Sequence, residues 1–149
     1  MLSTTATIRE SNVFTDTFLC LYSKINTISD PRGRSKWIYS SYPDIKNESE
    51  VDYPIIVVGH SDVTADPLTF KNVKDGPIRI SIDVYSTSAQ QTDSLSDSIA
   101  ATMESNESNF FTSGIHIMRL VSTSYGYFPR GTLRIHNKTL NYQFNFKWY

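Results

Sequence analysis

Cysteine is nearly missing from this sequence, and so are the features of a secreted scaffold or a membrane protein. Among 149 residues Cys20 is the one cysteine, so no disulfide can form within the chain. No apolar run approaches the roughly 18 residues of a membrane-spanning helix. Residues 1–10 lack the basic and apolar segments of a secretion signal. We therefore expect a protein that is made inside a cell and has no membrane partner.

An excess of charge of one sign is also missing. Fourteen Lys and Arg stand against fifteen Asp and Glu, which gives a formal net charge of −1 and a pI near 6.3. Dedicated nucleic-acid binders usually carry a basic excess, so the composition argues against that class. The balance leaves room for a local basic patch, because net charge does not report how charges are distributed.

Motifs of catalysis and phosphate binding are missing too. The chain contains neither GxGxxG nor GxxxxGK[ST], and His116 and His136 have no acidic or thiol neighbours at metal-ligand spacing. Around His60 the segment Gly-His-Ser-Asp invites a catalytic interpretation. Adjacent residues generally cannot form a Ser-His-Asp triad, so a polar turn at a strand end is favoured. Cys20 is expected to be a small core residue, and the sequence predicts no catalytic, cofactor or metal site.

A small basic cluster stands beside Trp37. Arg32, Arg34 and Lys36 could together contact phosphates, as basic residues interleaved with aromatics do. Three charges make a weak contact at most, and a solvated loop is the favoured interpretation.

The first periodic segment predicts a helix over residues 12–28. Apolar residues recur there on one helical stripe. They are Phe14, Phe18, Leu21, Tyr22, Ile25 and Ile28. Ser11 or Asn12 can cap the start of this helix, and Asp30-Pro31 ends it. Residues 35–40 then predict a short strand, followed by a polar, turn-like stretch.

The middle of the chain predicts two strands and a second helix. Residues 55–58 are a short apolar run, typical of a strand buried on both faces. Residues 61–76 predict a loop with a short strand at 68–70. Residues 78–88 alternate apolar and polar side chains, so one face meets the core and the other is wet or meets a partner. A helix over 93–103, capped by Thr92, follows.

The C-terminal part predicts three strands. One covers residues 115–124, and a loop over 125–131 joins it to a strand at 133–136. Asn137-Lys138 predicts a two-residue hairpin turn. The last strand alternates apolar with polar residues, and core packing is favoured for its apolar stripe over a partner surface. That stripe is Leu140, Tyr142, Phe144, Phe146 and Trp148.

These segments predict an α+β fold, in which a mixed, mostly antiparallel β-sheet packs on two helices in the order α-β-β-β-α-β-β-β. Residues 1–10 are expected to form a flexible N-terminal arm, and residues 11–149 a single domain.

The order of these segments resembles a known family. Residues 53–59, Tyr-Pro-Ile-Ile-Val-Val-Gly, are similar to a short strand of the small tail-completion proteins of tailed bacterial and archaeal viruses. The strand that starts at Gly76, the helix at 93–103 and the aromatic–polar strand at 142–148 follow in that family's order. The chain thus resembles a tail terminator, or tail-to-head joining protein, over residues 12–149. It departs from the family in an extra hairpin at 125–140.

The resemblance implies a structural virion protein and no enzyme. Such proteins form a ring, typically of six copies, that caps the tail tube and joins it to the head connector. The implied partners are copies of the chain, a tail tube protein and head-tail connector or neck proteins, while DNA passes transiently through the lumen. The implied location is the tail or neck of a virion assembled in the host cytoplasm.

A ring needs two different contact surfaces on each subunit. The polar faces of two predicted strands offer candidates for the subunit interface. These are Arg79, Ser81, Asp83, Tyr85 and Tyr149. Charge reversal at Arg79 or Asp83 is expected to weaken assembly and leave the monomer folded.

Two alternatives stay open. One is another viral part of related fold, either a head-completion protein or a tail tube protein. A tube protein usually needs a long hairpin arm, for which the loop at 61–76 is the only candidate that the sequence offers. The other is a small cytoplasmic enzyme or ligand-binding domain, with a pocket of residues 59–62 near Asp83.

Overall fold

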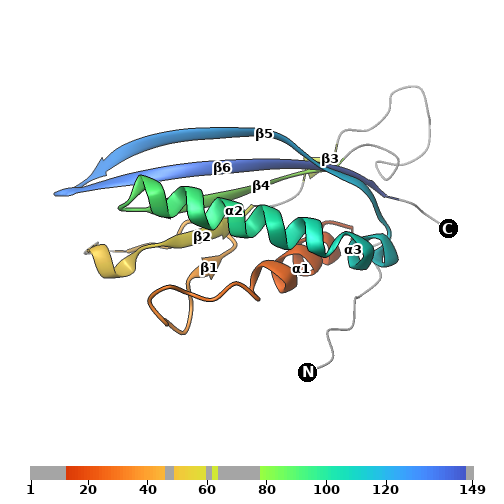
Figure 1. Ribbon diagram of the computed structural model, residues 1–149, viewed down its shortest axis with the longest axis horizontal. Coiled ribbons are helices and arrows are strands. Elements are labelled where there is room, and N and C mark those ends of the chain that lie inside the picture. Colours follow the sequence, from red (N-terminus) through yellow and green to blue (C-terminus); the bar gives the residue numbers. More distant parts are fainter. Residues whose placement is uncertain (1–12, 46–48, 60–61, 64–77, 147–149) are drawn as a thin grey trace.

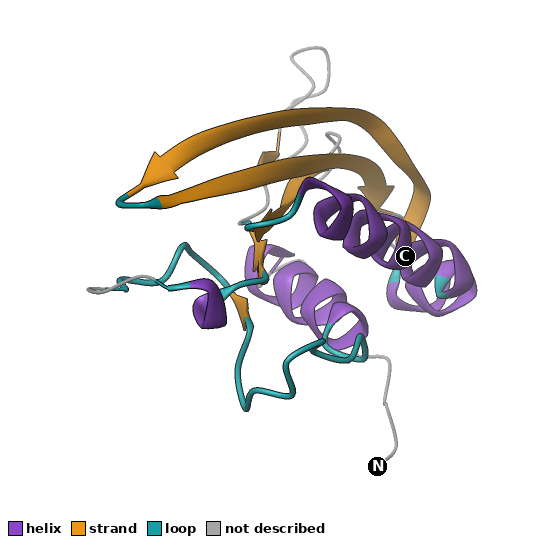
Figure 2. Cartoon of the chain, turned by 60° about the vertical axis from the view of Figure 1, so that its left-hand side comes forward, coloured by secondary structure: helices purple, strands orange, loops and turns teal. Residues whose placement is uncertain are grey.

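Helices cover one face of a curved β-sheet (Figures 1 and 2). The computed structural model describes residues 13–45, 49–59, 62–63 and 78–146. In these residues the α+β class and the mixed, mostly antiparallel sheet are confirmed. The element order differs from the prediction, because the described part of the chain has a further short strand and three α-helices in place of two.

The chain begins with helix α1, Val13–Ile25, strand β1, Ile38–Tyr39, and a 3₁₀ turn η2, Glu50–Asp52. Strands β2, β3 and β4 follow as Ile55–Val58, Asp62–Val63 and Ile78–Ser86. Helices α2 and α3 are Ala89–Ser105 and Glu107–Ser113, and strands β5 and β6 are Ile115–Arg130 and Leu133–Phe146. The sheet order is β1-β2-β4-β6-β5, with β3 also paired to β4. Only the β1–β2 pair is parallel among the described strands.

The core lies between the sheet and the helices. Alternate residues of β4 and β6 point into it, and the predicted stripe of the last strand is buried at Leu140, Tyr142 and Phe144, each at most 4% exposed. Core packing of that stripe is therefore confirmed for these three residues. Trp148 lies outside the described residues.

Helix α1 packs on this core over part of its predicted stripe. Leu21 and Ile25 are fully buried, whereas Phe14 is 49% exposed. Phe14 lies two turns ahead of Leu21 on the same side of the helix, so the core covers α1 only from about Thr17 onward. The predicted caps, Ser11 and Asn12, lie outside the described residues.

The second helical region is longer than its apolar stripe predicted. Ser88 caps α2, because its hydroxyl accepts a hydrogen bond from the Gln91 backbone N–H at 3.4 Å. The prediction of Thr92 as the cap is therefore wrong, and Thr92 lies buried inside the helix. The stretch after Asn106, to which the sequence pattern assigns no element, forms α3. Phe110 anchors this short helix in the core at 1% exposure. Its end is set by Gly114, whose φ of 105° is left-handed.

One long hairpin replaces three predicted strands. The predicted turn at Asn137-Lys138 is wrong, because both residues lie within β6 and pair with β4 on one side and β5 on the other. Residues 125–131, predicted as a loop, belong to β5 up to Arg130. The turn falls at Gly131, whose φ of +61° suits a residue without a Cβ. β5 lies at one edge of the sheet that the described strands form.

A second, smaller apolar cluster lies on the other face of the sheet. Tyr53, Ile55, Val57 and Ile135 are its buried members, which explains why β2 is buried on both faces, as predicted. The Arg34 guanidinium links the loop after α1 to η2, which precedes β2. It donates to the Asp52 carbonyl at 2.7 Å and to the Asp30 carboxylate at 2.9 Å.

Candidate functional site

Strand β4 carries four of the five predicted interface residues on the sheet face away from the helices. These are Arg79, Ser81, Asp83 and Tyr85. The residues between them face the helices and are at most 2% exposed, so the predicted alternation is confirmed. Tyr149, the fifth candidate, lies outside the described residues.

A ladder of polar side chains crosses this open face over β4, β6 and β5. Ser81 Oγ donates to Asn141 Oδ1 at 2.7 Å, and Asn141 Nδ2 donates to Ser122 Oγ at 3.0 Å. Arg79 Nε donates to Gln143 Oε1 at 3.4 Å. A hollow of about 490 Å³ follows these residues across the strands. The surface is therefore polar and ordered by its own cross-strand hydrogen bonds.

Asp83 and Tyr85 are less available to a partner than Arg79 and Ser81. Thr139 Oγ1 donates to the Asp83 carboxylate, while burial raises the pKa of this carboxyl. The Tyr85 ring packs edge-on against Tyr42, with ring centroids 4.9 Å apart, and also against Phe128 at 6.2 Å. Burial, helped by Asp83 and Tyr42, raises the pKa of Tyr85 to about 12. Much of the Tyr85 ring is thus occupied by contacts within its own chain.

The tip of the β5–β6 hairpin forms a second surface, which sequence reasoning missed. Tyr125 and Tyr127 are 54% and 61% exposed, although both are large aromatic residues. The Tyr127 ring lies 4.9 Å beneath the Arg134 guanidinium. Tyr125 stacks on His136 with centroids 5.9 Å apart, and its hydroxyl lies 2.5 Å from His136 Nδ1. We name Tyr125, Tyr127, Arg134 and His136 the hairpin tip.

The signal that could have found this surface is the distribution of charge along the sequence. Residues 114–149 contain five Lys and Arg and no Asp or Glu. Residues 80–118 show the reverse, with five Asp and Glu and no Lys or Arg. The net charge of −1 therefore hides a basic hairpin beside acidic helices. One ion pair joins the two parts, between Lys138 Nζ and Asp93 Oδ1 at 2.9 Å.

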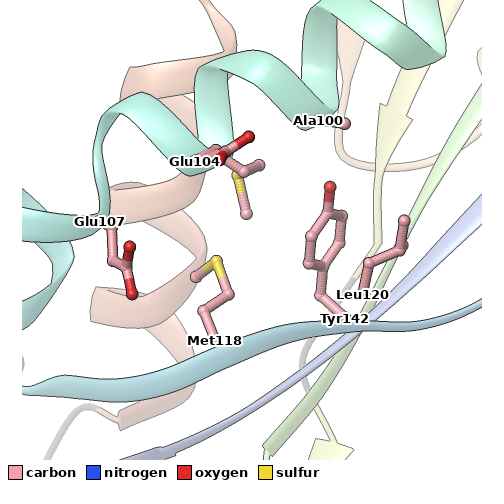
Figure 3. Close-up of a pocket in the computed structure, with 7 residues that line it drawn as sticks. Ala100, Glu104, Glu107, Met118, Leu120 and Tyr142 are labelled. Atoms are coloured by element: carbon pink, nitrogen blue, oxygen red, sulfur yellow. The ribbon is translucent and has the colours of Figure 1, made fainter.

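A third surface is an apolar groove between the helices and the edge strand (Figure 3). Met118 and Leu120 of β5 and Tyr142 of β6 rise toward the helices, and Glu104 and Glu107 stand on the helical side. The groove has a volume of about 280 Å³. We name it the acidic-rimmed groove; Ala100 and Met103 complete its lining.

Among the described residues, the one cysteine singled out for chemistry lies in the core. The Cys20 thiol is buried 3.8 Å from Ser113 Oγ, and burial raises its pKa, which agrees with a small core residue. No group of three or more metal-ligating side chains occurs within the described residues. His60 and Ser61, two of the four residues 59–62 in the suggested pocket, lie outside them. None of the described helices is long and apolar enough to cross a membrane.

The small basic cluster has mainly a structural role. Arg32 Nε donates to the Tyr53 carbonyl at 2.5 Å, and Arg34 is held as described above. Lys36 is exposed, with its ammonium 5.0 Å from the Tyr39 ring centroid. The two arginines therefore link one loop of the chain to another. The prediction of a solvated loop did not include these contacts.

No family model matches this chain, and no curated protein matches it.

Proposed function

We propose that the chain is a structural virion protein that forms a ring at the junction of tail and head. The ring caps the tail tube, meets the head connector and lets DNA pass through its lumen. The sequence segments that resemble the tail-completion family, at residues 53–59, 93–103 and 142–148, support the viral part of this proposal. The subunit interface includes the open face of β4 with Arg79 and Ser81.

The observation that carries the proposal is the exposed edge of the sheet. Along β5, four large apolar or aromatic side chains are between 44% and 61% exposed: Leu120, Val121, Tyr125 and Tyr127. A long edge strand with exposed apolar side chains is a template for pairing with another chain unless a partner covers it. A subunit of an assembly has such a partner.

A tail tube protein of related fold is the second candidate. Such a protein needs a long hairpin arm. The sequence offered only the loop at 61–76 for this arm, but the β5–β6 hairpin is a second candidate. A tube subunit stacks without limit, whereas a terminator ring closes after one layer.

Electron microscopy of the purified chain at high concentration tests the proposal. We expect closed rings of one layer with a central opening wide enough for duplex DNA. Long tubes would favour the second candidate. Dispersed particles of single-chain size at every concentration would contradict both.

A further inference from the structure

The hairpin tip and the acidic-rimmed groove are two separate surfaces along the β5–β6 hairpin. Figure 1 shows the β5–β6 turn at one end of the long axis, and the groove lies further back along the hairpin, where α2, α3 and β5 supply its lining. Helix α2 runs along the sheet. One chain therefore presents two different surfaces, as a head-to-tail contact between identical subunits requires.

The two surfaces are chemically complementary. The tip offers exposed aromatic rings and the Arg134 cation, within a segment that has no acidic residue. The groove offers an apolar floor, including Leu120 at 44% exposure, and carboxylates at Glu104 and Glu107 within a segment without Lys or Arg. Aromatic residues and arginine are the usual anchors of protein interfaces, and opposite charges fix the register of the contact.

The size of the groove also favours a side chain as its occupant. Its volume of about 280 Å³ lies at the lower limit of the roughly 300–1,000 Å³ that is typical of small-molecule pockets. The groove is open along β5, an edge strand, so an extended segment of another chain can reach it from the side.

We propose that the hairpin tip of one copy enters the acidic-rimmed groove of the next copy. This inference rests on the proposed function and names the subunit contact that builds the ring. Tyr127 and Tyr125 pack on the apolar floor, and Arg134 faces Glu104 and Glu107. Each copy uses its tip once and its groove once, so the contact repeats around the ring until it closes.

Two variants test the contact separately. Arg134→Glu reverses the charge of the tip, and the double variant Glu104→Lys/Glu107→Lys reverses the rim. All three side chains are exposed, so both variants are expected to fold, which circular dichroism checks. Tyr127→Ser is a second tip variant that changes no charge.

Matched controls change the same charges elsewhere. Lys36→Glu alters another exposed cation over a tyrosine ring, at 5.0 Å instead of 4.9 Å. Glu50→Lys alters an exposed glutamate in η2, outside both surfaces. Both controls should assemble like the wild type.

The decisive measurement is the mass of a mixture. Alone, each variant should need a concentration about tenfold higher or more than the wild type to assemble. Mixed in equal amounts, the tip variant still has a groove and the rim variant still has a tip. The reversed tip of one variant also faces the reversed rim of the other with opposite charges, so both contacts are restored and the mixture should assemble into alternating rings near the wild-type concentration.

Other outcomes overturn the inference in distinguishable ways. If the wild type forms closed rings and the variants do so equally well, the contact lies elsewhere and the proposed function stands. If the wild type never assembles, both fail. If tip variants assemble normally but lose binding to added duplex DNA, the tip is a polyanion surface and the subunit contact is refuted.

Discussion

Thr17 in α1 carries a hydroxyl that is buried and has no hydrogen-bond partner among the described residues. A desolvated, unpaired hydroxyl destabilises the folded state, so Thr17→Val should raise the free energy of unfolding by about 1 kcal/mol. Thr92 is the matched control, since it is equally buried in α2 but its Oγ1 donates to the Ala89 carbonyl at 2.6 Å. Thr92→Val should lower the unfolding free energy by about 1 kcal/mol. Urea unfolding measures both, and equal losses would contradict this account.

Tyr85 predicts a pH dependence of stability. Its pKa is raised from an ordinary 10.0 to about 12, so the folded state favours the neutral phenol. This contribution is fully present below pH 10 and is lost as the pH rises through 12. In Tyr85→Phe that loss should disappear, so its unfolding free energy should fall less steeply between pH 10 and 12.

Other tyrosines ionise in the same range, and the comparison of Tyr85→Phe with the wild type isolates the one ring. Urea unfolding at several pH values gives the two slopes. Identical slopes would mean that Tyr85 does not resist ionisation in the folded state.

At the scale of elements, Gly131 determines where the β5–β6 hairpin turns. Its φ of +61° disfavours any side chain, so Gly131→Ala should lower the unfolding free energy by about 1–2 kcal/mol. Gly126 lies in β5, and a Cβ there would meet nothing within 4 Å. Gly126→Ala should leave stability unchanged or raise it by about 0.5 kcal/mol. Thermal unfolding compares the two, and equal effects would contradict the assigned turn.

The open face of β4 gives a second prediction at this scale. Arg79 is exposed and contacts Gln143 at 3.4 Å, so Arg79→Glu should leave unfolding unchanged within about 0.5 kcal/mol. If this face belongs to the subunit interface, the variant should assemble only at higher concentration. Light scattering measures this, with Lys36→Glu as the control. Wild-type assembly would remove the β4 face from the interface.

Strands with a clear period of two were predicted correctly, because one face of each meets the core. The isoleucines of β4 and the stripe from Leu140 to Phe144 are examples. The turn predicted at Asn137 was wrong. Asparagine favours turns, but this residue is paired on both sides inside the sheet. The helix α3 has too few apolar residues for a periodic signal. Its one deep anchor, Phe110, is recognisable only in the packed structure.

The candidate site was predicted only in part. Alternation placed Arg79 and Ser81 on the open face, but no local pattern indicates that Tyr125 and Tyr127 share a surface with Arg134. That surface depends on the register of a long hairpin, for which the sequence pattern predicted separate short strands joined by a loop and a turn. The charge asymmetry of residues 80–118 and 114–149 was readable from the sequence and was hidden by the near-zero sum.

At the scale of the whole molecule, function depends on how copies meet. The helices and the core stabilise a curved sheet (Figure 2). The strand β5, the hairpin tip and the groove remain at the surface. Opposite charges on the hairpin tip and on the groove rim make the proposed contact sensitive to ionic strength, since salt screens partly exposed ion pairs. We expect the assembly to weaken as salt rises.

Native mass spectrometry of the wild-type chain over a range of concentrations tests the central claim most directly. The account predicts one dominant closed species whose mass is about six times 17.0 kDa, with few intermediates. A strict monomer at every concentration, or a continuous ladder of masses without a closed species, would contradict a ring.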